Sequence, residues 1–80
     1  MRLPRDLSGT ELVNALGKLG YSVSRQVGSH LRLTTQENGV HHVTIPNHKP
    51  LRVGTLASIL DEVALHHQIS REELLTRLRL

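Results

Sequence analysis

The chain has 80 residues, a formal net charge of +3 and no cysteine, which excludes disulfide bonds and thiolate zinc sites. Its length predicts a single domain, residues 1–80, with too little core for a deep pocket, so a large substrate would have to lie across the surface. No stretch approaches the roughly 20 apolar residues of a membrane span, and we expect a cytoplasmic protein that does not enter a membrane.

The positive charge is concentrated in the middle of the sequence. Residues 21–54 contain one acid, Glu37, four of the six histidines, and the basic residues Arg25, Arg32, Lys49 and Arg52. Such a segment suits an anionic ligand, most commonly a nucleic acid, although ordinary surface charge gives the same pattern. The single aromatic residue, Tyr21, argues against stacking of bases and favours recognition of an RNA backbone or shape.

The first predicted element is a helix over residues 8–19. Ser8 and Glu11 have the spacing of a capping box, and apolar residues recur after them at helical intervals. Gly20 can close this helix in a left-handed conformation.

Three strands are predicted to follow. Residues 21–27 and 30–35 alternate between apolar and polar positions on either side of a turn at Val27-Gly28-Ser29. A second turn is predicted at residues 37–39, where Asn-Gly tolerates positive φ angles, and leads into a third strand over residues 40–45. Pro46 would end that strand, and residues 47–53 would form a loop.

The C-terminal part predicts two helices. The first opens at Gly54-Thr55 and ends near His66 and His67, where cationic side chains meet the negative end of the helix dipole. Ser70 and Glu73 repeat the capping-box spacing before a short helix at about residues 70–78.

This order predicts an α+β fold, α-β-β-β-α plus a C-terminal helix, with a three-stranded antiparallel sheet covered by helices on one face. If the apolar residues of the second and third strands face the helices, alternation places four other side chains on the open face: His30, Arg32, His42 and Thr44. A β-bulge would interrupt this alternation.

His30 is the candidate for catalysis. An imidazole there could remove the proton of an RNA 2′-hydroxyl, which then attacks the adjacent phosphorus without a metal, while Arg32 stabilises the developing charge. The alternative is an inert surface histidine. The loop residues His48, Lys49 and Arg52 precede a helix N-terminus and would suit a phosphate, or they are simply solvated. A zinc or nickel site from His30, His42 and His48 lacks the local spacing of metal ligands, and we predict none.

Three stretches of the chain together resemble the HicA-type toxins, also called YcfA-like mRNA interferases. They are LSGTELVNALGKLGY, VSRQVGSHLRL and VTIPNHKPLRVGTLASILDEV. The match as a whole extends from about residue 3 to residue 65, in the order and spacing of that family. Their most specific elements are the triplet Gly28-Ser29-His30, the strand end Ile45-Pro46-x-His48 and the helix start Gly54-Thr55-Leu56. The C-terminal helix and the pair His41-His42 lie outside the family pattern.

The resemblance implies a double-stranded-RNA-binding-like fold, cleavage of mRNA without a metal or other cofactor, and a HicB-type antitoxin that covers the surface around His30. It assigns the activity to His30. We therefore predict His30 as the catalytic residue and an RNA-binding set consisting of Arg25, Ser29, Arg32, His48, Lys49 and Arg52. His42, His48, Lys49 and Arg32 remain alternatives for a second catalytic group.

Two functions of other classes remain open. The chain could be an RNA-binding module without catalysis, whose affinity would fall steeply with salt. It could also be a partner-binding domain whose open sheet face only meets another protein.

Overall fold

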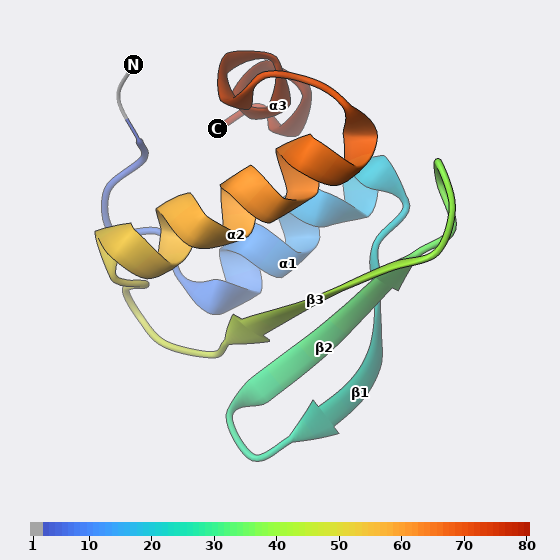
Figure 1. Ribbon diagram of the computed structural model, residues 1–80. Helices are drawn as coiled ribbons and strands as arrows, with labels where there is room; N and C mark the ends of the chain where they lie inside the picture. The colour runs from blue at the N-terminus through green and yellow to red at the C-terminus, as the bar shows by residue number, and fades with distance from the viewer. Residues whose placement is uncertain (1–2) are drawn as a thin grey trace.

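The computed structural model describes residues 3–80 and has the predicted order of elements (Figure 1). Helix α1 (Gly9–Leu16) continues into a short 3₁₀ helix, η1 (Gly17–Leu19). Three strands follow, β1 (Ser22–Val27), β2 (His30–Thr35) and β3 (His41–Pro46), and then the helices α2 (Val53–His67) and α3 (Arg71–Leu78). Helices α1 and α2 lie side by side over the sheet, and α3 packs on the side of the helices that faces away from it (Figure 1).

The sheet is antiparallel with the strand order β1-β2-β3, as predicted. The inward side chains of its central and third strands are buried in one apolar core with the helices; they are Leu31, Leu33, Val43 and Ile45. The alternate positions His30, Arg32, His42 and Thr44 are all exposed. The prediction for the open face is therefore confirmed.

Strand β1 departs from the predicted pattern. It begins at Ser22, every one of its six residues is exposed, and its register shifts between Val23 and Arg25. The strict alternation predicted for residues 21–27 is wrong because the extra residue in this bulge moves the following side chains to the opposite face. As a result Arg25 pairs directly opposite Arg32.

The first helix is shorter than the predicted range of 8–19. Ser8 makes both bonds of the predicted capping box with Glu11, and the resulting backbone and side-chain hydrogen bonds, with a smaller effect of Lys49, lower the pKa of Glu11. The α-helix ends at Leu16 and its last turn tightens to 3₁₀ geometry, beginning at Gly17, a poor helix former. Gly20 closes this turn at a φ of 80°.

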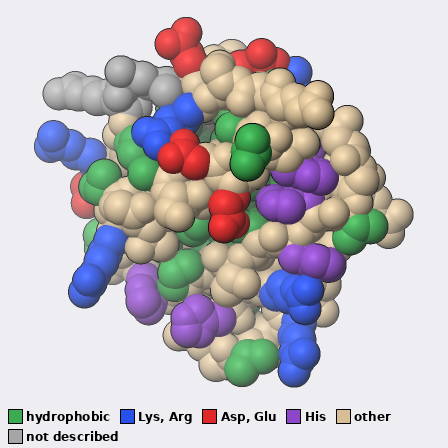
Figure 2. Space-filling view, in the orientation of Figure 1, with side chains coloured by type: hydrophobic (Ala, Val, Ile, Leu, Met, Phe, Trp, Pro, Cys, Tyr) green, Lys and Arg blue, Asp and Glu red, His purple; other side chains and the backbone are tan. Residues whose placement is uncertain are grey.

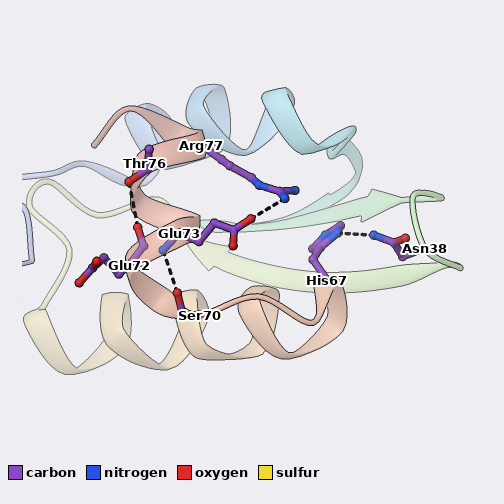
Figure 3. A network of polar contacts seen from close by, with 7 residues as sticks. All are labelled: Asn38, His67, Ser70, Glu72, Glu73, Thr76 and Arg77. Carbon is purple, nitrogen blue, oxygen red and sulfur yellow. Dashed lines mark hydrogen bonds and ion pairs between the residues drawn. The ribbon is translucent and has the colours of Figure 1, made fainter.

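The two C-terminal helices also differ in detail from the prediction. Helix α2 begins at Val53, one residue early, with Arg52 at its N-cap and Gln68 as its left-handed C-cap. In α3 the Ser70 hydroxyl accepts a hydrogen bond from the Glu73 N–H at 3.0 Å. The Glu73 carboxylate pairs with Arg77 instead of completing a capping box (Figure 3). Within residues 3–80, none of the helices is both long and apolar enough to span a bilayer.

Candidate functional site

The turn between β1 and β2 determines where His30 stands. Gly28 has a φ of +58° and is the first of two turn residues, the position at which a type II′ hairpin turn requires glycine. This two-residue turn pairs Val27 with His30, so the histidine is the first residue of β2. Its ring is exposed and makes no hydrogen bond within residues 3–80.

Two depressions of the surface meet at His30. The first, which we call the arginine hollow, lies over the open face of the sheet, has a volume of about 240 Å³, and is lined by Arg25, Val27, His30, Arg32 and Thr44. Two guanidinium groups beside an unpartnered imidazole form a site that suits a phosphate or phosphodiester. The bulge in β1 is what adds Arg25 to this hollow.

The second depression, the β3–α2 groove, runs between the edge strand and the helix and has a volume of about 640 Å³. Its aliphatic lining comes from Val43, Pro46 and Ile59. Its polar side chains are His30, His42, Thr44, Thr55, Ser58 and Glu62. In Figure 2, histidine side chains gather around an acidic group along the boundary between α2 and the sheet, and cationic side chains extend below it.

A chain of polar contacts orients His42 on the open face. The Ser24 hydroxyl lies 3.2 Å from the Arg32 carbonyl oxygen and 2.7 Å from the Thr34 hydroxyl. Thr34 Oγ1 is in turn 2.8 Å from His42 Nδ1. These contacts hold the ring with Nδ1 toward Thr34, so Nε2 is left available to a ligand.

The predicted RNA-binding residues of the 47–52 loop lie apart from both depressions. His48, Lys49 and Arg52 are exposed, but none of them lines the arginine hollow or the β3–α2 groove. The loop is held at the start of α1 by hydrogen bonds from the Gly9 N–H to the His48 carbonyl and from the Leu51 N–H to the Leu7 carbonyl. The structure thus brings Arg25 and Arg32 to His30 but leaves these three residues outside the site.

Ser29 contributes through its backbone. Its carbonyl accepts a 2.6 Å hydrogen bond from the Asn47 N–H, and the Asn47 side chain in turn accepts from Thr10. This contact ties the β1–β2 turn to the end of β3. Ser29 therefore helps to hold the turn that presents His30.

A protein-family model matches the part of the chain that contains this site. It is described as the HicA toxin of bacterial toxin-antitoxin, and it matches residues 9–65. The chain belongs to this family. No curated protein and no solved structure gives a significant match. As a HicA-family member the chain is a toxin of a toxin–antitoxin system, which implies an antitoxin as its partner.

The matched range of the HicA family contains the β1–β2 turn, His30 and both depressions, whereas α3 lies beyond residue 65. Within the described residues 3–80, no three histidine, aspartate or glutamate side chains are grouped so that they could hold a metal ion. His30 and His42 line the same groove, but His48 does not join them.

A second histidine cluster of this HicA-family chain lies at the other end of β3. Tyr21 Oη is 2.7 Å from His41 Nδ1 and 3.1 Å from His67 Nε2, and the Asn38 amide is 3.1 Å from His67 Nδ1 (Figure 3). His66 Nε2 donates to the carbonyls of Glu37 and Gly39. The prediction that the paired histidines only meet the helix dipole is therefore incomplete, because their rings join α2 to the β2–β3 turn.

Sequence reasoning missed the contribution of α2 to the site. Thr55, Ser58 and Glu62 line the β3–α2 groove and recur at intervals of three and four residues. This polar stripe runs beside the buried apolar stripe of the same helix, and its helical period is the signal that could have revealed it. No comparable pattern in the sequence indicates the bulge at Ser24.

Proposed function

We propose that this toxin is an endoribonuclease that cleaves mRNA, with His30 as its general base or acid. The observation that carries the proposal is the position of His30 at the head of β2, exposed and without a partner, where the arginine hollow meets the β3–α2 groove. Membership of the HicA family supports a toxin, and the site supplies the groups that RNA cleavage requires.

Each step of the cleavage can be assigned to a residue near His30. The imidazole removes the proton of a ribose 2′-hydroxyl, and that oxygen attacks the adjacent phosphorus. Arg25 and Arg32 lie in the same hollow and stabilise the negative charge that develops on the phosphorane. The 5′-oxygen leaves with a proton from the solvent of the open hollow, and a 2′,3′-cyclic phosphate remains. No step requires a cofactor.

The open face of the sheet also suits a protein partner. We propose that a HicB-type antitoxin covers the surface around His30 and thereby excludes RNA. This face presents a continuous surface of exposed side chains from β2 and β3 beside the fully exposed β1. An antitoxin bound there would block both depressions at once.

The decisive experiment compares wild type with His30→Ala and His30→Gln. We expect both substitutions to abolish RNA cleavage and relieve growth arrest, while the free energy of unfolding changes by less than about 1 kcal/mol, because the ring is exposed and makes no described hydrogen bond. RNA integrity after expression and equilibrium unfolding measure the two effects. Lys18→Gln, a remote exposed substitution on η1, is the control that should leave cleavage intact.

Two outcomes would contradict the proposal. Full cleavage by a folded His30→Ala protein would remove His30 from the mechanism. Salt-dependent retention of RNA by wild type, with no cleavage at any protein concentration, would instead indicate a non-catalytic RNA-binding module, which the two arginines also suit.

A further inference from the structure

The β3–α2 groove differs chemically from the arginine hollow beside it. The hollow contains two guanidinium groups, whereas no lysine or arginine among residues 3–80 lines the groove, and the one formal charge among its described residues is the Glu62 carboxylate. A phosphate therefore suits the hollow better than the groove. The aliphatic and hydrogen-bonding lining of the groove suits a neutral, flat group with polar edges, which in RNA is a nucleobase.

The length and direction of the groove follow from its two walls. Along β2 and β3, His30 pairs with Pro46 and His42 pairs with Thr34, so the two histidines are four residues apart, or about 13 Å between Cα atoms. Along α2, Gly54 and Glu62 are eight residues apart, or about 12 Å. Both walls give a groove of the same length, with His30 at one limit of the strand wall and His42 at the other.

This separation means that the two histidines have different tasks. Rings attached to Cα atoms about 13 Å apart stand too far from each other to act on one phosphorus atom. A single RNA strand can still meet both, with the scissile phosphate at His30 and a neighbouring nucleotide farther along the groove. The position of His42 therefore suits a contact with the nucleotide that flanks the cleavage site.

Glu62 gives the groove a hydrogen-bond acceptor, and His42 gives it an available ring nitrogen. The Glu62 carboxylate makes no ion pair or hydrogen bond within residues 3–80, and the His42 ring is held only through Nδ1. A carboxylate suits a base that presents the N–H groups of an exocyclic amine, as adenine, cytosine and guanine do. Uracil has no exocyclic amine and presents a single N3–H between two carbonyl oxygens, which a carboxylate disfavours.

We propose that the β3–α2 groove is a nucleobase subsite next to the scissile phosphate, in which the Glu62 carboxylate selects a base with an exocyclic amino group over uracil and the ring of His42 lines the same site. Thr34 is a positioning residue, because its hydroxyl fixes the ring of His42. The proposal rests on the proposed ribonuclease function and adds to it a residue-level origin of sequence preference.

The test measures base preference in binding and in cleavage. Short single-stranded RNAs that differ only in one base, uracil or cytosine, are bound to His30→Ala protein, so that binding is measured without cleavage. We expect the protein to bind the RNA with cytosine more tightly than the RNA with uracil. In Glu62→Gln the ratio of the two affinities should fall by on the order of tenfold, since the amide can also donate to a uracil carbonyl. Thr34→Val should weaken the preference in the same direction, because it frees the His42 ring.

The matched control is Glu72→Gln, which removes the same charge from an exposed position on α3, away from every described depression. It should leave the preference unchanged. Mapping of cut sites for the corresponding variants in the active His30 background gives an independent readout, in which cleavage beside uracil should rise for Glu62→Gln.

The outcomes separate the two proposals. If wild type cleaves RNA and neither Glu62→Gln nor Thr34→Val alters the base preference, the subsite is overturned while the ribonuclease function stands. If wild type does not cleave but Glu62→Gln still changes the preference in binding, the ribonuclease proposal fails and the subsite is supported.

Discussion

At the scale of single residues, Gly9 is a point where α1 lies directly against the end of the sheet. A Cβ atom added at Gly9 would lie 2.3 Å from the Pro46 carbonyl oxygen and 3.0 Å from the Asn47 Cα. The Gly9 N–H also donates to the His48 carbonyl at 2.9 Å. The absence of a side chain therefore allows β3 to end against α1, and the same segment holds the Ser29 carbonyl beside His30.

Gly9→Ala should destabilise the protein. The clash involves backbone atoms, which cannot rotate away, so we expect a loss of about 1–3 kcal/mol in the free energy of unfolding. Gly17→Ala is the control, because nothing lies within 4 Å of its added Cβ and its φ of −54° is helical. That variant should be neutral or up to about 1 kcal/mol more stable. Urea denaturation measures both, and equal effects of the two substitutions would contradict the assigned contact.

At the scale of elements, the bulge in β1 has the largest effect on the site. Without it, Arg25 would lie opposite buried Leu31, one pair away from Arg32 and on the other face of the sheet. The Ser24 hydroxyl, at the bulge, lies 2.7 Å from the Thr34 hydroxyl, which in turn contacts the ring of His42. The extra residue in this exposed strand thus adds Arg25 to the arginine hollow.

Removal of either arginine should weaken RNA binding through charge. In Arg25→Gln and Arg32→Gln, made in the His30→Ala background, each variant should lower the magnitude of the slope of log Kobs against log salt by about 0.7, the value for one lost contact with a single strand. Lys18→Gln removes the same charge from η1 and should leave the slope as it was. A salt titration of RNA binding decides this, and equal slopes for all three variants would show that only net charge matters.

Much of this architecture follows from local sequence signals, and the exceptions have physical causes. Alternation in β2 and β3 predicted the open face with His30 correctly, because these strands bury one side against the helices. It failed in β1, which buries neither side and so has no apolar face to maintain the period. The other features of the site depend on contacts between residues far apart in sequence, which local patterns do not predict. Hydrogen bonds hold His48 near α1, and the stripe of Thr55, Ser58 and Glu62 lies beside β3 only in the folded chain.

At the scale of the whole molecule, the cluster of Tyr21, His41, His66 and His67 connects segments that are far apart in sequence. His41 and His66 stack with ring centroids 4.4 Å apart, and His67 is only 7% exposed. Burial, then the neighbouring His66, lowers the pKa of both His41 and His67, and burial raises the pKa of Tyr21 to about 12. The other charged or titratable groups that face the cluster are Glu37, Glu62, His42 and Arg77.

These shifts predict that the protein loses stability as the solution is acidified. The folded state disfavours the protonated forms of His41 and His67, whereas the unfolded chain regains an ordinary histidine pKa of about 6.5. As pH falls through this value, the unfolded state binds more protons than the folded state, so the free energy of unfolding decreases. Above this value both states leave the two histidines neutral, and the stability is fully retained. Tm should therefore be lower at pH 5.5 than at pH 7.5, a window that lies above the lowered pKa of Glu11.

The matched variants are His67→Gln and His48→Gln. The first removes a buried histidine of the cluster, so it should be less stable than wild type at pH 7.5, by roughly 1–3 kcal/mol for the lost hydrogen bonds. Its Tm should nevertheless decrease less than that of wild type between pH 7.5 and pH 5.5. The second changes an exposed ring of the 47–52 loop and should keep the wild-type dependence on pH. If Tm of wild type is the same at both pH values, or if His67→Gln retains the full decrease, protonation of this cluster does not govern the acid sensitivity of the fold.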